Sequence, residues 1–356
     1  MGERAGAAPQ DDELRRWLAA RGVDDRTDGA RGIDDERLAG LAGDLVLERT
    51  SELSAREVAA RAGVPLSHVV GMFHDLGVLV PDVDAPLFSP FDVAFVERMH
   101  GAAEIGIVQG RDLLRVVAGA MERIAEAAVA VYVQGLEREL RRQGASLAEM
   151  AEANVRATAL ALELGDGLGA VFRHHMRQAV ARQRVVQEGV ARRELARLAV
   201  GFVDLVGSTR LHAGLDPDEL GEFVSRFESQ AFEVVAAHEG RLVKFIGDAI
   251  MFAAVDPTAG CRIAADLVRT FTADGTQPRG GLVFGEVLFR HGDYYGPVVN
   301  LAARLAAAAI PGEVLVDRAV AEALADDDEL TFEPAGRRML KGFDRPVTVW
   351  SLDPTA

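Results

Sequence analysis

The spacing of apolar residues changes near residue 198, and this change constrains the fold more than any other feature of the chain. Before it, apolar side chains recur every three or four residues, which is typical of helices with one buried face. One such series is Val117, Met121, Ile124, Ala128 and Val131. After it, short apolar runs alternate with amphipathic segments, which favours strands and helices in turn. The sequence therefore predicts a helical first half and an α+β second half.

The chain is long enough for more than one domain. Its 356 residues exceed an ordinary domain, and a hydrophobic content of 49% supplies apolar residues for two cores. We expect a flexible tail, an all-helical domain, an arginine-rich helical linker and an α+β domain whose helices cover one face of its sheet. The expected bounds of these four parts are 1–33, 34–172, 173–197 and 198–356.

Charge and cysteine content disfavour several classes of protein. The formal net charge of −16 disfavours binding to nucleic acid or to an anionic membrane. The apolar runs are shorter than the roughly 18–20 residues that span a bilayer, and the first residues lack the apolar core of a signal peptide. The single cysteine, Cys261, is typical of a reducing compartment. We therefore expect a cytoplasmic protein with no membrane span.

Residues 52–79 resemble a helix-turn-helix of the transcription-regulator type. The segment Ser54–Glu57 is a capping box that starts the first helix, and Gly63–Pro65 breaks the chain before the second. The second helix carries histidine and aspartate but no lysine or arginine, whereas a recognition helix needs cations or amides to contact phosphates and bases. We therefore expect a helical packing module here and no DNA partner.

Two aspartates lie where predicted strands end or turn. Asp204 ends the first strand of the second half, and Asp248 lies in a hairpin turn. Carboxylates are suitable ligands for Mg²⁺ or Mn²⁺ together with substrate phosphates, and two such ions can assist a displacement at phosphorus. The turn Gly207, Ser208 and Thr209 has backbone N–H groups that can contact phosphate oxygens. Taken singly, each feature is also ordinary turn chemistry.

In combination, these residues resemble the catalytic domain of the class III nucleotidyl cyclases. Asp204 lies in Phe-x-Asp-x-x-Gly, Lys244 lies four residues before Asp248, and the run Asp293–Arg304 contains polar residues at the family's spacings. The resemblance covers residues 198 to 352 in order. It implies a ferredoxin-like, palm-type domain with an antiparallel-rich sheet. It also implies a homodimer with two divalent cations, Mg²⁺ or Mn²⁺, in sites shared between the two chains.

The resemblance also implies a role for each polar residue. It implies that the metal ligands are Asp204, Leu205 and Asp248, and that the base is bound by Lys244 and Asp293. It implies that Asn300 and Arg304 orient the ribose and stabilise the transition state. The residues implied to bind the phosphates are Gly207, Ser208, Thr209 and Lys341. Guanylate-selective relatives are expected to carry Glu and Cys at positions 244 and 293, so the sequence predicts an adenylate cyclase that takes ATP. The alternatives are a guanylate cyclase, or a non-catalytic ligand-binding or DNA-binding regulator on the same scaffold.

The first half resembles the regulatory region of soluble actinobacterial cyclases, some of which are inhibited by that region and respond to pH. His174, His175 and Met176 stand out in the arginine-rich segment, because histidine titrates near neutral pH and a charged pair would repel its neighbours. A pH-gated, autoinhibitory segment is the prediction, and an exposed pair without a role is the alternative. The apolar helices predicted over 90–143 would either enclose a lipid-like ligand or simply pack together.

Overall fold

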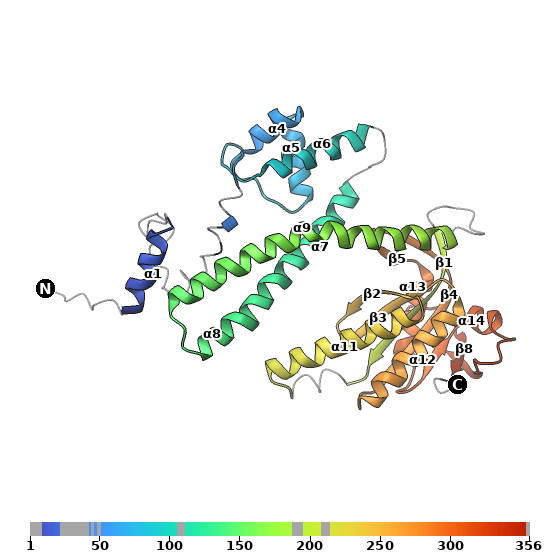
Figure 1. Cartoon of the computed structure of the whole chain (residues 1–356). Coiled ribbons are helices and arrows are strands. Elements are labelled where there is room, and N and C mark those ends of the chain that lie inside the picture. Colours follow the sequence, from blue (N-terminus) through green and yellow to red (C-terminus); the bar gives the residue numbers. More distant parts are fainter. Residues whose placement is uncertain are drawn as a thin grey trace. The chain divides into compact units, whose positions relative to one another are not determined.

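The computed structural model describes residues 9–21, 43, 46–47, 51–104, 111–186, 195–207 and 214–353. The chain forms two compact units, Met1–His174 and His175–Ala356 (Figure 1). The division falls inside one long helix, α9, which runs from Leu147 to Val186. Among the described residues, none of the helices is long and apolar enough to cross a membrane.

The first unit is helical, as predicted. Its other helical elements are α1 (Pro9–Ala19), α4 (Ala55–Ala62), α5 (Leu66–Asp75), α6 (Pro90–Glu104), α7 (Arg111–Val131), the π-helical turn η2 (Tyr132–Glu137) and α8 (Arg138–Arg142). α4, α5 and α6 share a core with Phe88, which also forms an isolated β-bridge with Leu53. Two short helices separated by a turn therefore lie where the segment 52–79 predicted them.

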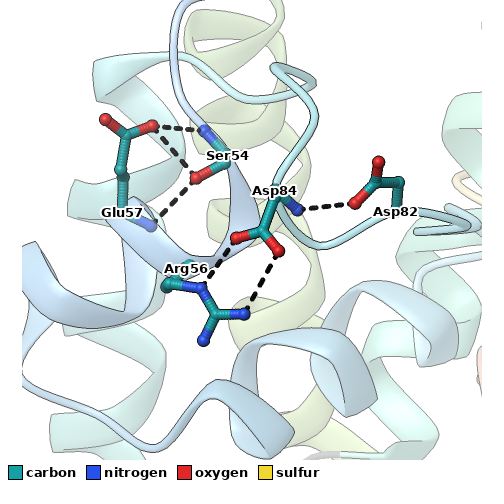
Figure 2. Close-up of polar contacts among 5 residues, drawn as sticks. All are labelled: Ser54, Arg56, Glu57, Asp82 and Asp84. Carbon is teal, nitrogen blue, oxygen red and sulfur yellow. Dashed lines mark hydrogen bonds and ion pairs between the residues drawn. The ribbon is translucent and has the colours of Figure 1, made fainter.

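Capping interactions explain why α4 begins where it does (Figure 2). The Ser54 hydroxyl accepts the Glu57 N–H at 3.2 Å, and the Glu57 carboxylate accepts the Ser54 N–H at 2.8 Å, which lowers the pKa of Glu57. Arg56 binds Asp84 through two nitrogens, at 2.7 and 3.3 Å. Gly63 ends the helix with a φ of 68°, a conformation that glycine adopts at low cost.

Two parts of the first unit differ from the sequence predictions. Residues 9–19, expected in a flexible tail, form α1, because Leu14 and Leu18 are buried against Ala151 of α9 and Trp17 Nε1 donates to Glu152 at 3.1 Å. α9 continues past residue 173, where the arginine-rich linker was expected to begin, and ends at Val186, so no break separates the preceding helical part from that linker.

The second unit is an eight-stranded sheet with helices. Its elements are β1 (Leu195–Leu205), α11 (Pro217–Ala237), β2 (Arg241–Ile246), β3 (Ala249–Ala254), α12 (Pro257–Ala273), β4 (Pro278–Arg290), β5 (Asp293–Tyr295), α13 (Pro297–Ala308), β6 (Val314–Val316), α14 (Arg318–Ala323), β7 (Phe332–Arg338) and β8 (Val347–Leu352) (Figure 1). The strand order is β2-β3-β1-β4-β6-β8-β7, and β5 pairs with β4. The strand pairs are antiparallel apart from β4 with β6. The first four strands, with α11 and α12, have the ferredoxin-like order, so the predicted fold class is confirmed.

The helices cover both faces of the sheet, so the expectation of one covered face is wrong. Val203 of β1 lies on one face of the sheet and packs in a core with α11, α12 and α14. Its neighbour Phe202 lies on the opposite face and packs in a second core with α13. Residues along β1 are buried on both faces. A nearly continuous apolar run is typical of a strand covered twice, and this signal was present in the sequence of β1.

Gly281 allows α13 to lie close against β4. An added Cβ at this position would lie 2.2 Å from the Ala306 backbone nitrogen and 2.5 Å from the Ala302 carbonyl oxygen. We therefore expect Gly281→Ala to destabilise the protein by about 1–3 kcal/mol, since the helix would have to move. Thermal unfolding measures the effect. Gly221→Ala, where the added methyl meets open space on α11, is the matched control and should be neutral or slightly stabilising. Equal unfolding temperatures for the two variants would contradict this packing argument.

Candidate active site

Strand pairing brings Asp204 and Asp248 to neighbouring strand ends. Asp204 of β1 pairs with Ala249, the first residue of β3, and Asp248 directly precedes Ala249 in the β2–β3 turn. Gly247 completes this two-residue turn with a φ of 63°. Both aspartates are half-buried. The two carboxylates, 44 residues apart in sequence, therefore lie at one edge of the sheet.

Arg279 belongs to this site, although the sequence analysis did not select it. It lies opposite Asp204 on β4, and its Nε and Nη2 donate to Asp204 Oδ2 at 3.2 and 2.9 Å. Its Nη1 donates to the Ala307 carbonyl at 2.8 Å, at the C-terminal end of α13, where a cation is favourable. The signal in the sequence is limited to a charged residue at the start of an apolar strand. Its partner, Asp204, is identified only by the pairing of β1 with β4.

Lys244 and Asp293 form an ion pair between β2 and β5. The two side chains are 42% and 21% exposed, so the pair is accessible without being fully solvated. Asp293 Oδ1 also accepts the Tyr294 N–H at 2.8 Å. An ammonium donor beside a carboxylate acceptor can recognise a ring that offers an acceptor and a donor on one edge.

Asn300 and Arg304 lie one turn apart on α13 and are both exposed. The opposite side of the helix, with Ala302, Leu305 and Ala306, is buried on the sheet. Within the described part of the chain, neither polar side chain makes a hydrogen bond or ion pair to another residue. α13 thus presents both groups to a ligand or to another chain.

The remaining predicted residues are placed as follows. Leu205 is buried opposite Pro278, Gly207 follows β1 with a φ of 79°, and Lys341 is exposed in a turn after β7. Ser208 and Thr209 lie outside the described residues. His174, His175 and Met176 are exposed on α9.

The register places the polar groups on one face of the sheet. Met251 and Ala253 of β3 lie in the core that includes α13, and Lys244 pairs with Met251. Asp204 follows the same alternation as Phe202 in that core, and Arg279 reaches the end of α13. Asp204 and the Lys244–Asp293 ion pair therefore share the α13 side of the sheet, and Asp248 lies in the adjoining turn.

The first unit has a separate hollow of about 1200 Å³. Residues from α1, α7, η2, α8 and α9 line it, among them Trp17, Tyr132, Leu136 and Leu160. Tyr132 Oη donates to the Met150 carbonyl at 3.2 Å and so connects η2 to α9. Burial raises the pKa of Tyr132. The lipid-like ligand suggested for the helices over 90–143 stays a prediction, and only the later part of that range, from α7 to α8, lines this hollow.

Sequence comparison identifies the family. Residues 279–353 match the family model described as the adenylate and guanylate cyclase catalytic domain. The chain is 35% identical to an adenylate cyclase of Streptomyces coelicolor, with 79% of this chain and 74% of that protein covered. The chain belongs to the adenylate and guanylate cyclase family. The cyclase is also 37% identical to an uncharacterized protein of Mycobacterium tuberculosis, with 89% of this chain and 83% of that protein covered.

One further relative covers the first half as well as the catalytic domain. A pH-sensitive adenylate cyclase of Mycobacterium tuberculosis is 29% identical to the cyclase, over 99% of this chain and 90% of that protein. Among solved structures, the adenylyl cyclase CyaB from P. aeruginosa matches with 22% identity and a TM-score of 0.39, over 44% of this chain and 94% of that one.

Proposed function

We propose that this cyclase converts ATP into 3′,5′-cyclic AMP and pyrophosphate. The observation that supports the proposal most directly is the Lys244–Asp293 pair on the sheet face that also carries Asp204. The Lys244 ammonium donates to a ring nitrogen of adenine, and the Asp293 carboxylate accepts from the exocyclic amine. Relatives named adenylate cyclase support the same substrate.

The residues at the strand ends fit divalent cations. Asp204 and Asp248 supply two half-buried carboxylates, and the Leu205 carbonyl lies next to Asp204 in the chain. Such oxygen donors, completed by substrate phosphates, match the preference of Mg²⁺ and Mn²⁺. When bound, the two cations would neutralise the triphosphate and increase the acidity of the ribose hydroxyl.

The chain's own residues bind and orient the reactants. Asn300 orients the ribose so that its 3′-oxygen lies in line with the α-phosphorus, and Arg304 stabilises the charge that grows there. The new bond joins the 3′-oxygen to the α-phosphorus, and the bond to the pyrophosphate oxygen breaks. The hydroxyl proton leaves to solvent or to a phosphate. Lys341 and the N–H groups after Asp204 hold the outer phosphates.

The site forms between two copies of the chain in this proposal. Asn300 and Arg304 are exposed on α13, and no described residue of their own chain pairs with their side chains. A two-fold dimer would bring the α13 residues and the Lys244–Asp293 pair of one copy to the aspartates of the other, and it would create two equal sites. A monomer would be inactive.

The direct test measures products from the purified full-length chain. With ATP and either Mn²⁺ or Mg²⁺, we expect cyclic AMP and pyrophosphate in equal amounts, and much slower turnover of GTP. Faster turnover of GTP would identify a guanylate cyclase instead. If neither nucleotide is converted at any pH from about 6 to about 8, although the chain is folded and dimeric, the non-catalytic scaffold is the correct function.

We also propose that the first unit inhibits the enzyme and that mild acid releases this inhibition. His174 and His175 lie on α9 next to Arg173 and within one turn of Arg177. Protonation of the imidazoles places further positive charge beside these arginines, which weakens the helix or its packing. We expect activity to rise as pH falls from about 8 to about 6, and the His174→Ala/His175→Ala variant to lose this rise. His74→Ala, an exposed histidine on α5, should keep it. An unchanged profile in the double variant removes these residues from the switch.

A further inference from the structure

Arg241 lies on the same face of β2 as Lys244 because the strand contains a bulge. Arg241 pairs with Ala253 and Lys244 pairs with Met251, so Val243 is the extra residue between them. In a regular strand, residues three apart point to opposite faces. One inserted residue changes this alternation and aims both cationic side chains at the α13 side of the sheet.

The Arg241 guanidinium contacts the residues on both sides of Asp293. Nη2 donates to the Gly292 carbonyl at 2.5 Å, and Nη1 donates to the Tyr294 hydroxyl at 3.1 Å. The guanidinium carbon also lies over the Phe289 and Tyr294 rings, 5.4 and 5.2 Å from their centroids. The planar fork of arginine supports such simultaneous hydrogen bonding and stacking.

These contacts hold the tip of a short hairpin. β4 and β5 pair through three residues on each strand, and the two-residue turn His291–Gly292 has φ values of 56° and 77°. A positive φ is uncommon for any residue other than glycine, and it costs free energy unless the surroundings hold the turn in place. Asp293 is the first residue after the turn. Its carboxylate therefore stays beside Lys244 only while the hairpin tip stays on β2.

We propose that Arg241 is a positioning residue for recognition of the nucleotide base. This inference rests on the proposed function, because it assumes that Lys244 and Asp293 read the base. Arg241 does not touch the purine. It fixes Asp293 at the distance from Lys244 that suits the donor and acceptor of an adenine edge, and thereby contributes to the choice of ATP over GTP.

The test compares Arg241→Met and Arg241→Lys with the native full-length chain. For Arg241→Met we expect the KM for ATP to rise about tenfold with a smaller change in kcat, as for the loss of one charge-assisted hydrogen bond. The ratio of kcat/KM for ATP to that for GTP should fall. Arg241→Lys should restore only part of the native KM and nucleotide preference, since lysine lacks the planar guanidinium. Arg262→Met, which removes a surface ion pair with Glu329, is the matched control and should behave as native.

Hydrogen exchange separates a failure of this inference from a failure of the proposed function. In Arg241→Met the amides of residues 288–295 should exchange faster, whether or not the enzyme has activity. Unchanged exchange would show that Arg241 does not hold the hairpin tip, and would overturn the inference. Faster exchange with native KM and native nucleotide preference would show a structural contact only, and would also overturn the inference. A native chain that converts neither nucleotide refutes the proposed function, and with it the positioning role.

Discussion

An Asp204→Asn chain should form no detectable cyclic AMP alone, and activity should return when it is mixed with a Lys244→Ala chain. The first variant loses a carboxylate for the cations, and the second loses the donor to the base. In a mixed dimer the proposed arrangement leaves one site with native Asp204 from one chain and native Lys244 from the other. Random mixing should recover about a quarter of native activity, because half of the dimers are mixed and each has one intact site.

This substitution is mild for the fold. The asparagine oxygen can still accept from Arg279, which donates to Asp204 Oδ2 at 2.9 Å, so Arg279 keeps a partner. Asp326→Asn, an exposed aspartate between α14 and β7, is the matched control and should retain native activity. If the mixture stays inactive although the two chains associate, the shared site is wrong and each chain must act alone.

Replacing Arg304 by methionine should lower kcat by about 10²–10³-fold with little change in KM. Arg304 stabilises charge that develops only in the transition state, and the loss of one such group has this magnitude in other enzymes. The fold should not change, since Arg304 is exposed and α13 packs through Ala302, Leu305 and Ala306. Steady-state kinetics measure kcat and KM, and thermal unfolding measures the stability of the fold.

The control for Arg304 removes an arginine of similar exposure. Arg318→Met loses a helical ion pair with Glu322 on α14 and should keep native kcat. Mixing of variant chains adds a second check. In the proposed site, one chain contributes both Arg304 and Lys244, and the other chain contributes the aspartates. Arg304→Met should recover activity with Asp204→Asn but not with Lys244→Ala. A rise in KM with native kcat would instead indicate a ground-state contact with the nucleotide.

Local patterns were sufficient for most elements of the second unit. The hairpin turn that contains Asp248 was predicted where Gly247 and Asp248 connect β2 to β3, because turn residues and apolar spacing act over short stretches of chain. The strand β7 (Phe332–Arg338) carries little of this local signal. All seven of its residues are exposed or half-buried, so it lacks the apolar pattern that indicates a strand.

The sequence alone determined the fold class and the set of polar residues, from Asp204 to Arg304, that carries the family resemblance. Only the tertiary structure showed that Arg279 holds Asp204 and that a bulge at Val243 turns Arg241 toward the residues around Asp293. The physical reason is that residue type and spacing act within a few turns of chain. Register and bulges, in contrast, depend on which distant strand each segment pairs with.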